Sequence, residues 1–220
     1  MIGNFQIVFG EWRSFAEGFF NTIWICVAAG AVALILAVPI SMLLRSRRRW
    51  VRRAVGAIVD VLRSVPFLML LFIIYYCLPA LGLRLSAWTC GLVGLAVYNA
   101  AYFAEILRGA WAHLPHEQEE AGLAFGMRGT QLYLRIVFPQ IFIAAGPVLS
   151  NQFITLIKNS AFLMVITIPD LTFMANKVQA IHFIPFETLL TAVALYWVMC
   201  FAVERLARML ETVAAVRGHE

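Results

Sequence analysis

The chain has 220 residues and a formal net charge of +5, and 62% of the residues are hydrophobic while only 13% are charged. A soluble domain carries about 25% charged residues, so this composition excludes an ordinary soluble enzyme, and its hydrophobicity excludes a disordered chain. The arginines lie beside apolar stretches, which favours membrane flanks over a nucleic-acid partner. We therefore expect a protein of the lipid bilayer that forms a single domain over residues 1–220.

Charge-poor stretches of about 20 residues mark helices that can cross a bilayer. They predict an all-α membrane protein with five spans, and six spans is the alternative. The expected spans are residues 19–44, 64–83, 85–104 (continuing to about Trp111), 136–157 and 183–203. The apolar stretch 161–169 is too short to cross and is expected to form a packed or re-entrant segment. Pro39 and Pro147 lie inside the first and fourth spans, where they are expected to kink or interrupt the helices.

Basic residues predict the orientation, because cytoplasmic connections carry an excess of lysine and arginine. The first connection is the most basic part of the chain and contains Arg45, Arg47, Arg48, Arg49, Arg52 and Arg53. We therefore place this connection, the link 108–135 and the C-terminus in the cytoplasm, and the N-terminus outside. Five spans satisfy this pattern, whereas six would put the tail on the outer side. The same arginines could also attract anionic lipid.

The link between the third and fourth spans has the features of a short surface helix followed by a turn and a second helix. Pro115 is suited to the first helical position, and acidic residues at 117, 119 and 120 favour the first turns of a helix. Gly126 can end this helix with a positive φ, and a second helical stretch covers 130–136. The link thus offers a compact apolar and acidic surface to a partner.

The same link carries a pattern that resembles the EAA loop of ABC importer permeases, which reads E-A-A, three residues, G, nine residues, I-x-L-P. The matching residues are Glu120, Ala121, Gly122, Gly126, Ile136, Phe138 and Pro139. Gly122 replaces the second alanine and Phe138 replaces the leucine, which are mild departures. The resemblance implies that residues 113–135 form coupling helices that dock in a groove of an ATPase subunit, with Glu120, Ala121, Gly122, Gly126 and Pro139 as the coupling residues.

Further stretches resemble one subfamily, the polar amino acid permeases of the histidine and glutamine type, over residues 18–210. They are Arg63-Ser64-Val65-Pro66, residues 101–109 (AYFAEILRG), Pro139-Gln140 and residues 158–162 (KNSAF). The resemblance implies a prokaryotic inner-membrane importer with a second permease chain, identical or related, and an extracytoplasmic substrate-binding protein. It also implies that no cofactor binds this chain, because ATP and magnesium bind the separate ATPase; accordingly, the chain has no G-x-x-x-x-G-K-[ST] motif.

Polar residues inside spans are costly and are candidates for contact with a solute. The candidates for the substrate pathway are Asn99, Asn151, Thr155, Lys158, Asn159 and Ser160. Hydrogen bonding between helices is the alternative explanation for these residues. Asn159 stands where relatives often carry aspartate, which favours a neutral, acidic or otherwise polar amino-acid-like solute over a cationic one. A different small polar solute is the alternative.

Other interpretations are less well supported by the residues. Glu105 and Arg108 are spaced for an ion pair at i and i+3, which either stabilises the helix end or changes partners during gating. His113 and His116 form a weak candidate metal pair, but position 120 is glutamate where H-E-x-x-H requires a second histidine. No G-x-S-x-G motif supports a hydrolase. A simple channel or scaffold protein would not require a docking surface on one cytoplasmic link.

Overall fold

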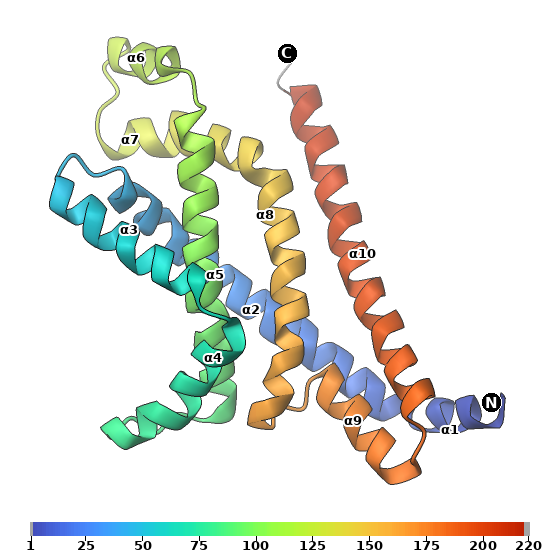
Figure 1. The fold of residues 1–220 in the computed structure, drawn as a ribbon. Helices are drawn as coiled ribbons and strands as arrows, with labels where there is room; N and C mark the ends of the chain where they lie inside the picture. Colours follow the sequence, from blue (N-terminus) through green and yellow to red (C-terminus); the bar gives the residue numbers. More distant parts are fainter. Residues whose placement is uncertain (1, 218–220) are drawn as a thin grey trace.

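The structure is a computed structural model that describes the backbone of residues 2–217 and the side chains of residues 5–209, other than those of His116 and Glu119. Every element in this part of the chain is helical (Figure 1). The α-helices are α1 (Ile2–Gly10), α2 (Trp12–Leu44), α3 (Arg49–Ser64), α4 (Phe67–Phe72), α5 (Ala87–Ala112), α6 (His116–Ala124), α7 (Thr130–Leu132), α8 (Phe138–Ser160), α9 (Leu171–His182) and α10 (Pro185–Arg217). Shorter π-helical turns (Ile73–Cys77 and Tyr133–Val137) and 3-10 turns (Leu78–Leu81 and Ala161–Ile166) adjoin them.

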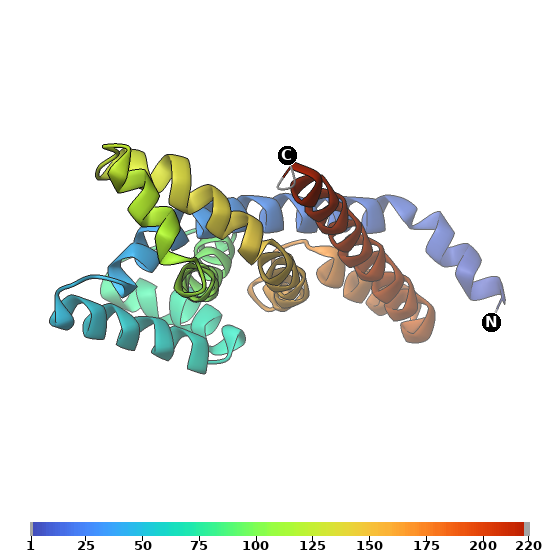
Figure 2. The same ribbon diagram turned by 90° about the horizontal axis from the view of Figure 1, so that it is seen from above.

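Four helical segments are long and apolar enough to cross a membrane: Trp12–Leu44, Ala87–Ala112, Thr130–Ile166 and Pro185–Met209. A fifth crossing is available if Arg49–Ser64 and Phe67–Leu81 act as one broken span, although these two parts meet at 103°. The expected all-α fold with about five spans is therefore confirmed. In Figure 1, α5, α8 and α10 run along the bundle while α2 crosses it diagonally, and Figure 2 shows that the arrangement is elongated when seen from above.

The second expected span, 64–83, differs most from the structure. Pro66 lacks an N–H and restricts the residue before it to extended backbone. Accordingly, Val65 has φ −91° and ψ 137°, and the helix breaks between α3 and α4. The preceding connection, which we expected to be a basic loop, contains the 16-residue helix α3. Helix α3 was not predicted, because its arginines interrupt the apolar pattern that marks a membrane span.

Small residues bring the first and third spans together. On α2, Ala29, Ala33 and Ala37 recur every four residues and are fully buried, and Ala100 and Ala104 are buried on α5. Small side chains let two helix backbones approach closely, which is the main source of packing energy between helices in a bilayer. This α2–α5 contact is the most extensive one among the described residues and fixes the position of α5, which carries the buried amide of Asn99.

The segment after the fourth span is packed as expected. Leu163, Ile166 and Ile168 are almost completely buried, so these residues anchor the segment 161–169 in the core. The amide N–H of Leu171 donates to Thr22 Oγ1 at 3.0 Å, which ties the start of α9 to α2. Helix α9 itself was not predicted. Pro39 and Pro147 lie inside α2 and α8, and both helices continue past their prolines rather than being interrupted.

Candidate functional site: a projecting helix pair and a polar face of α8

The link between the third and fourth spans projects from one end of the bundle as α6 and α7 (Figure 1). Pro115 precedes the first residue of α6, and Gly126 follows its C-terminal turn with φ +79°, as the sequence predicts. Two hydrogen bonds close this turn, from Gly126 N to Leu123 O at 3.0 Å and from Met127 N to Gly122 O at 3.0 Å. Because a positive φ strains residues that carry a Cβ, glycine at 126 holds the geometry that turns the chain back toward α7.

Close contact holds α6 against α7 at Gly122. A Cβ atom added at Gly122 would lie 2.4 Å from Cδ1 of Leu132, which is buried beneath α6. An alanine here would therefore require the Leu132 side chain to move. This contact gives a physical reason for the departure from the E-A-A pattern, in which alanine occupies this position.

Apolar side chains are exposed in the second half of α6 and just after its last residue. Phe125 is 86% exposed and Leu123 is 53% exposed, and Ala121 and Ala124 are also exposed. Glu120 lies beside them and is exposed as well. Large apolar side chains gathered at the tip of a projection indicate a site of protein–protein contact. Leu123 and Phe125 were not among the predicted coupling residues, since exposure within the link cannot be read from the sequence.

An aromatic cluster connects the base of this projection to the spans. The ring of Trp111 at the end of α5 lies 5.5 Å from that of Tyr133 and 5.8 Å from that of Phe138. The guanidinium of Arg45, just after α2, lies 4.7 Å from the Trp111 ring. Pro139, a predicted coupling residue, is exposed at the start of α8 and not on the projection itself. The base of the projection is therefore packed against the ends of α2, α5 and α8.

The predicted substrate-pathway residues separate into two groups. Asn99 is fully buried, where its Nδ2 donates to Leu95 O at 2.8 Å and its Oδ1 accepts from Gln152 Nε2 at 3.0 Å. Ser160 is also buried, and its hydroxyl donates to Ile157 O at 2.7 Å. The polar groups of both residues have partners inside the chain: Asn99 is bonded to a second helix through Gln152, and Ser160 is bonded within α8.

The other group forms a polar face on α8. Asn151 and Lys158 are exposed, and Thr155 and Asn159 are partly exposed. Thr155 follows Asn151 by four residues, and Lys158 and Asn159 follow Thr155 by three and four, so all four lie on one side of the helix. The hydroxyl of Thr155 donates to Asn151 O at 3.1 Å, and Lys158 forms no ion pair with an acidic side chain of the described residues. This polar face is directed away from the chain's own core.

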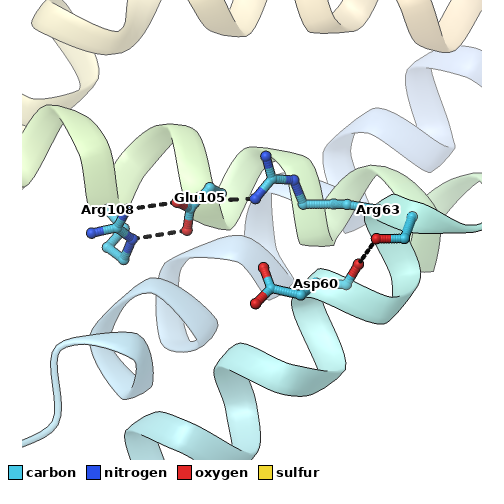
Figure 3. Close-up of polar contacts among 5 residues, drawn as sticks. Asp60, Arg63, Glu105 and Arg108 are labelled. Atoms are coloured by element: carbon cyan, nitrogen blue, oxygen red, sulfur yellow. Dashed lines mark hydrogen bonds and ion pairs between the residues drawn. The ribbon is translucent and has the colours of Figure 1, made fainter.

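A charged cluster ties the end of α3 to α5 (Figure 3). Arg108 donates to Glu105 with Nε at 2.8 Å and with Nη2 at 2.6 Å, which confirms the expected ion pair. Nη1 of Arg63 lies 4.0 Å from Glu105 Oε1, and the Tyr102 hydroxyl donates to Arg63 O at 3.0 Å. Asp60, Glu105 and Arg108 line a cavity of about 280 Å³. The contact with Arg63 was not predicted, because the two residues are distant in sequence.

Five available crossings, a projecting apolar helix pair and a polar face on a spanning helix together define a multi-pass membrane protein of the transporter class. Residues 29–213 match the family described as binding-protein-dependent transport system inner membrane component. The chain therefore belongs to this family, and it is an inner-membrane permease subunit rather than a catalytic enzyme.

Named relatives and solved structures agree with this assignment. The chain is 30% identical over 196 residues to the "Probable glutamine ABC transporter permease protein GlnM" of Bacillus subtilis (strain 168), covering 89% of this chain and 91% of that protein. It is 34% identical over 190 residues to the octopine transport system permease protein OccM of Rhizobium meliloti, covering 82% and 78%. A crystal structure of an amino acid ABC transporter with histidines superposes with a TM-score of 0.84 at 27% identity, over 93% of this chain and 96% of that one.

Proposed function

We propose that this chain is one of two permease subunits of a prokaryotic importer that moves a polar amino acid or an amino-acid-like solute. The names of the relatives support this solute class, since they include permeases for glutamine, octopine and L-cystine. A different small polar solute is the alternative. The energy comes from ATP, bound with magnesium by a separate ATPase, and an extracytoplasmic binding protein delivers the solute.

The exposed apolar surface of α6 is the observation that carries the ATPase assignment. A Phe125 side chain that is 86% exposed gains stability only when a partner covers it. The residues 113–135 thus form the coupling link. Glu120, Ala121 and Phe125 lie on the docking surface, and Gly122 and Gly126 shape it. Pro139 lies at the base, where docking is transmitted to α8.

The polar face of α8 supports a solute pathway between two permease chains. Lipid cannot satisfy the amide and ammonium groups of Asn151, Lys158 and Asn159, so polar side chains that point out of the chain require a polar neighbour. A second permease copy or a related chain facing α8 would enclose these groups. Because Asn159 carries no charge, we expect a neutral or acidic solute to be preferred over a cationic one.

The position of the termini supports the proposed orientation. In Figure 1, α6 and the C-terminal end of α10 lie at one end of the bundle, whereas α1 lies at the opposite end. The basic connection that includes Arg45 also contacts the α6 end, through Trp111. We therefore place α6 and the C-terminus in the cytoplasm and the N-terminus outside.

Co-purification tests the ATPase assignment. The chain is expressed together with the ATPase, binding protein and second permease of its importer, and the complex is isolated through a tag on this chain. Phe125→Asp should abolish retention of the ATPase while leaving membrane insertion unchanged. Leu81→Asp is the control, because Leu81 is an equally exposed apolar residue far from α6. Full retention of the ATPase by Phe125→Asp would refute the proposed docking surface.

A further inference from the structure

Helix α3 presents an apolar stripe that none of the described residues covers. Trp50, Ile58 and Val61 are 69%, 61% and 62% exposed, and their spacing of eight and three residues places them on one side of the helix. Ala54 and Ala57 lie between them and are also exposed. The stripe therefore runs from the start of α3 to its last turn.

The opposite side of α3 is packed against the bundle. Val59 is 3% exposed and belongs to the core that includes Leu44 of α2, and Val55 and Leu62 pack against the same core. Tyr102 of α5 also holds the last turn through its hydrogen bond to Arg63 O. The helix is thus fixed to the chain by one face, so the apolar stripe is an outward surface of a well-packed helix.

An uncompensated positive charge lies at the start of the same helix. Six exposed arginines lie within nine residues: Arg45, Arg47, Arg48, Arg49, Arg52 and Arg53. None of them forms an ion pair with a carboxylate of the described residues, and Asp60 is the only acidic residue of α3. Arg45 instead lies over Trp111, and Arg52 donates to Ser46 O at 3.4 Å. This cluster of unpaired positive charges is therefore suited to binding an anionic partner.

The direction of α3 fits a helix that lies along a membrane surface. It meets the following segment Phe67–Leu81 at 103°, so the two cannot both be aligned with the membrane normal. In Figure 1, α3 runs across the bundle while α5 runs along it, and α3 begins on the side of α6. A helix with an apolar face flanked by arginines is typical of segments that lie in the interface between headgroups and acyl chains.

We propose that α3 lies in the cytoplasmic membrane interface, with its apolar stripe in the acyl chains and its arginine cluster bound to the headgroups of anionic phospholipids. Two features select this occupant over a neutral lipid or a protein. The cluster carries six positive charges without a counterion, and Trp50 places an amphipathic ring at the depth that tryptophan favours in membranes.

Lipid binding to the purified, intact chain tests the headgroup assignment. Native mass spectrometry would compare phosphatidylglycerol with phosphatidylcholine for the unaltered protein and for the triple variant Arg48→Gln, Arg49→Gln, Arg53→Gln. Each arginine near an anionic surface contributes about fivefold in affinity, so the triple variant should bind phosphatidylglycerol roughly 100-fold more weakly, and salt should weaken binding of the unaltered protein.

The control is the double variant Arg13→Gln, Arg84→Gln, which removes exposed arginines outside this cluster and should retain full binding. Far-ultraviolet circular dichroism would check that all variants are folded. Equal binding of both lipids by the unaltered protein, or an equal loss in the control and the triple variant, would overturn the headgroup assignment.

A depth measurement tests the position of α3 independently. Spin labels at Ile58→Cys and Arg53→Cys, in a chain whose four native cysteines are replaced, would be examined in the assembled transporter in lipid nanodiscs. We expect position 58 to be accessible to oxygen, which dissolves in the bilayer, and position 53 to a water-soluble nickel complex. If position 58 is instead protected from both reagents, a partner chain covers the stripe; if it is accessible to nickel, the stripe faces water. Either result overturns the proposal.

Discussion

The hydrogen bond between α5 and α8 allows a structural role of Asn99 to be separated from a role in solute binding. Asn99 is fully buried, and its Oδ1 has Gln152 Nε2 as its donor at 3.0 Å. Hydrogen bonds between membrane helices contribute about 0.6 kcal/mol on average and about 1.7 kcal/mol at most. We expect Asn99→Ala and Gln152→Ala to lower the free energy of unfolding, with a coupling energy of about 0.6–1.7 kcal/mol in a double-mutant cycle.

The assay combines unfolding in detergent with transport by the reconstituted importer. The two alanine variants should lose stability while the KM for the amino acid changes by less than about twofold, because Asn99 is buried and the Gln152 amide is held by its hydrogen bond to Asn99. Asn151→Ala is the matched control: it lies on that exposed face and should raise KM with little loss of stability. A large rise in KM for Asn99→Ala, with no loss of stability and no coupling to Gln152, would refute the structural role.

Three further predictions concern packing and charge. Gly18→Ala should destabilise the bundle by about 1–3 kcal/mol, because the added Cβ would lie 2.8 Å from Leu171 Cα. Gly146→Ala is the control and should be tolerated, because a Cβ there meets no atom within 4 Å. The melting temperatures of the two variants would be compared. Burial raises the pKa of Asp170 to about 7. The native state therefore holds this proton more tightly than the unfolded chain does, so stability should fall as the pH rises from about 4 to 7 and then level off, and Asp170→Asn should remove this slope in pH-dependent melting. Glu105→Gln should cost less than about 1 kcal/mol in chemical unfolding, because the Glu105 ion pairs are partly exposed; a larger loss, or a loss of coupling between ATP hydrolysis and transport at unchanged stability, would favour the gating role.

Local signals predicted the coupling link well. Pro115 and Gly126 mark the start and end of α6 by backbone restrictions that act within one turn, so neighbouring residues suffice to place them. Most of the spans could also be predicted from the sequence, because a bilayer requires long apolar stretches whichever helices pack against them. The helix break at Pro66 arises from the same kind of local backbone restriction, but the expected span 64–83 did not take it into account.

Contacts between distant residues could not be predicted. Asn99 and Asn151 both present amides within expected spans, and only the position of Gln152 shows that the first is satisfied inside the chain. Helix α3 was hidden for a related reason: its arginines obey the orientation rule for loops, while its helical structure depends on packing of Val59 against α2 and α5. Exposure of Phe125 likewise follows from the direction in which α6 projects.

The most direct test of the coupling role is to identify what contacts residue 125 in the working transporter. A photoreactive amino acid at position 125 would be activated in membranes that contain the complete importer, with position 81 as the control. We predict a crosslink from position 125 to the ATPase subunit whose yield changes with nucleotide, and none from position 81. Crosslinks from position 125 only to lipid or to an extracytoplasmic protein would contradict the account.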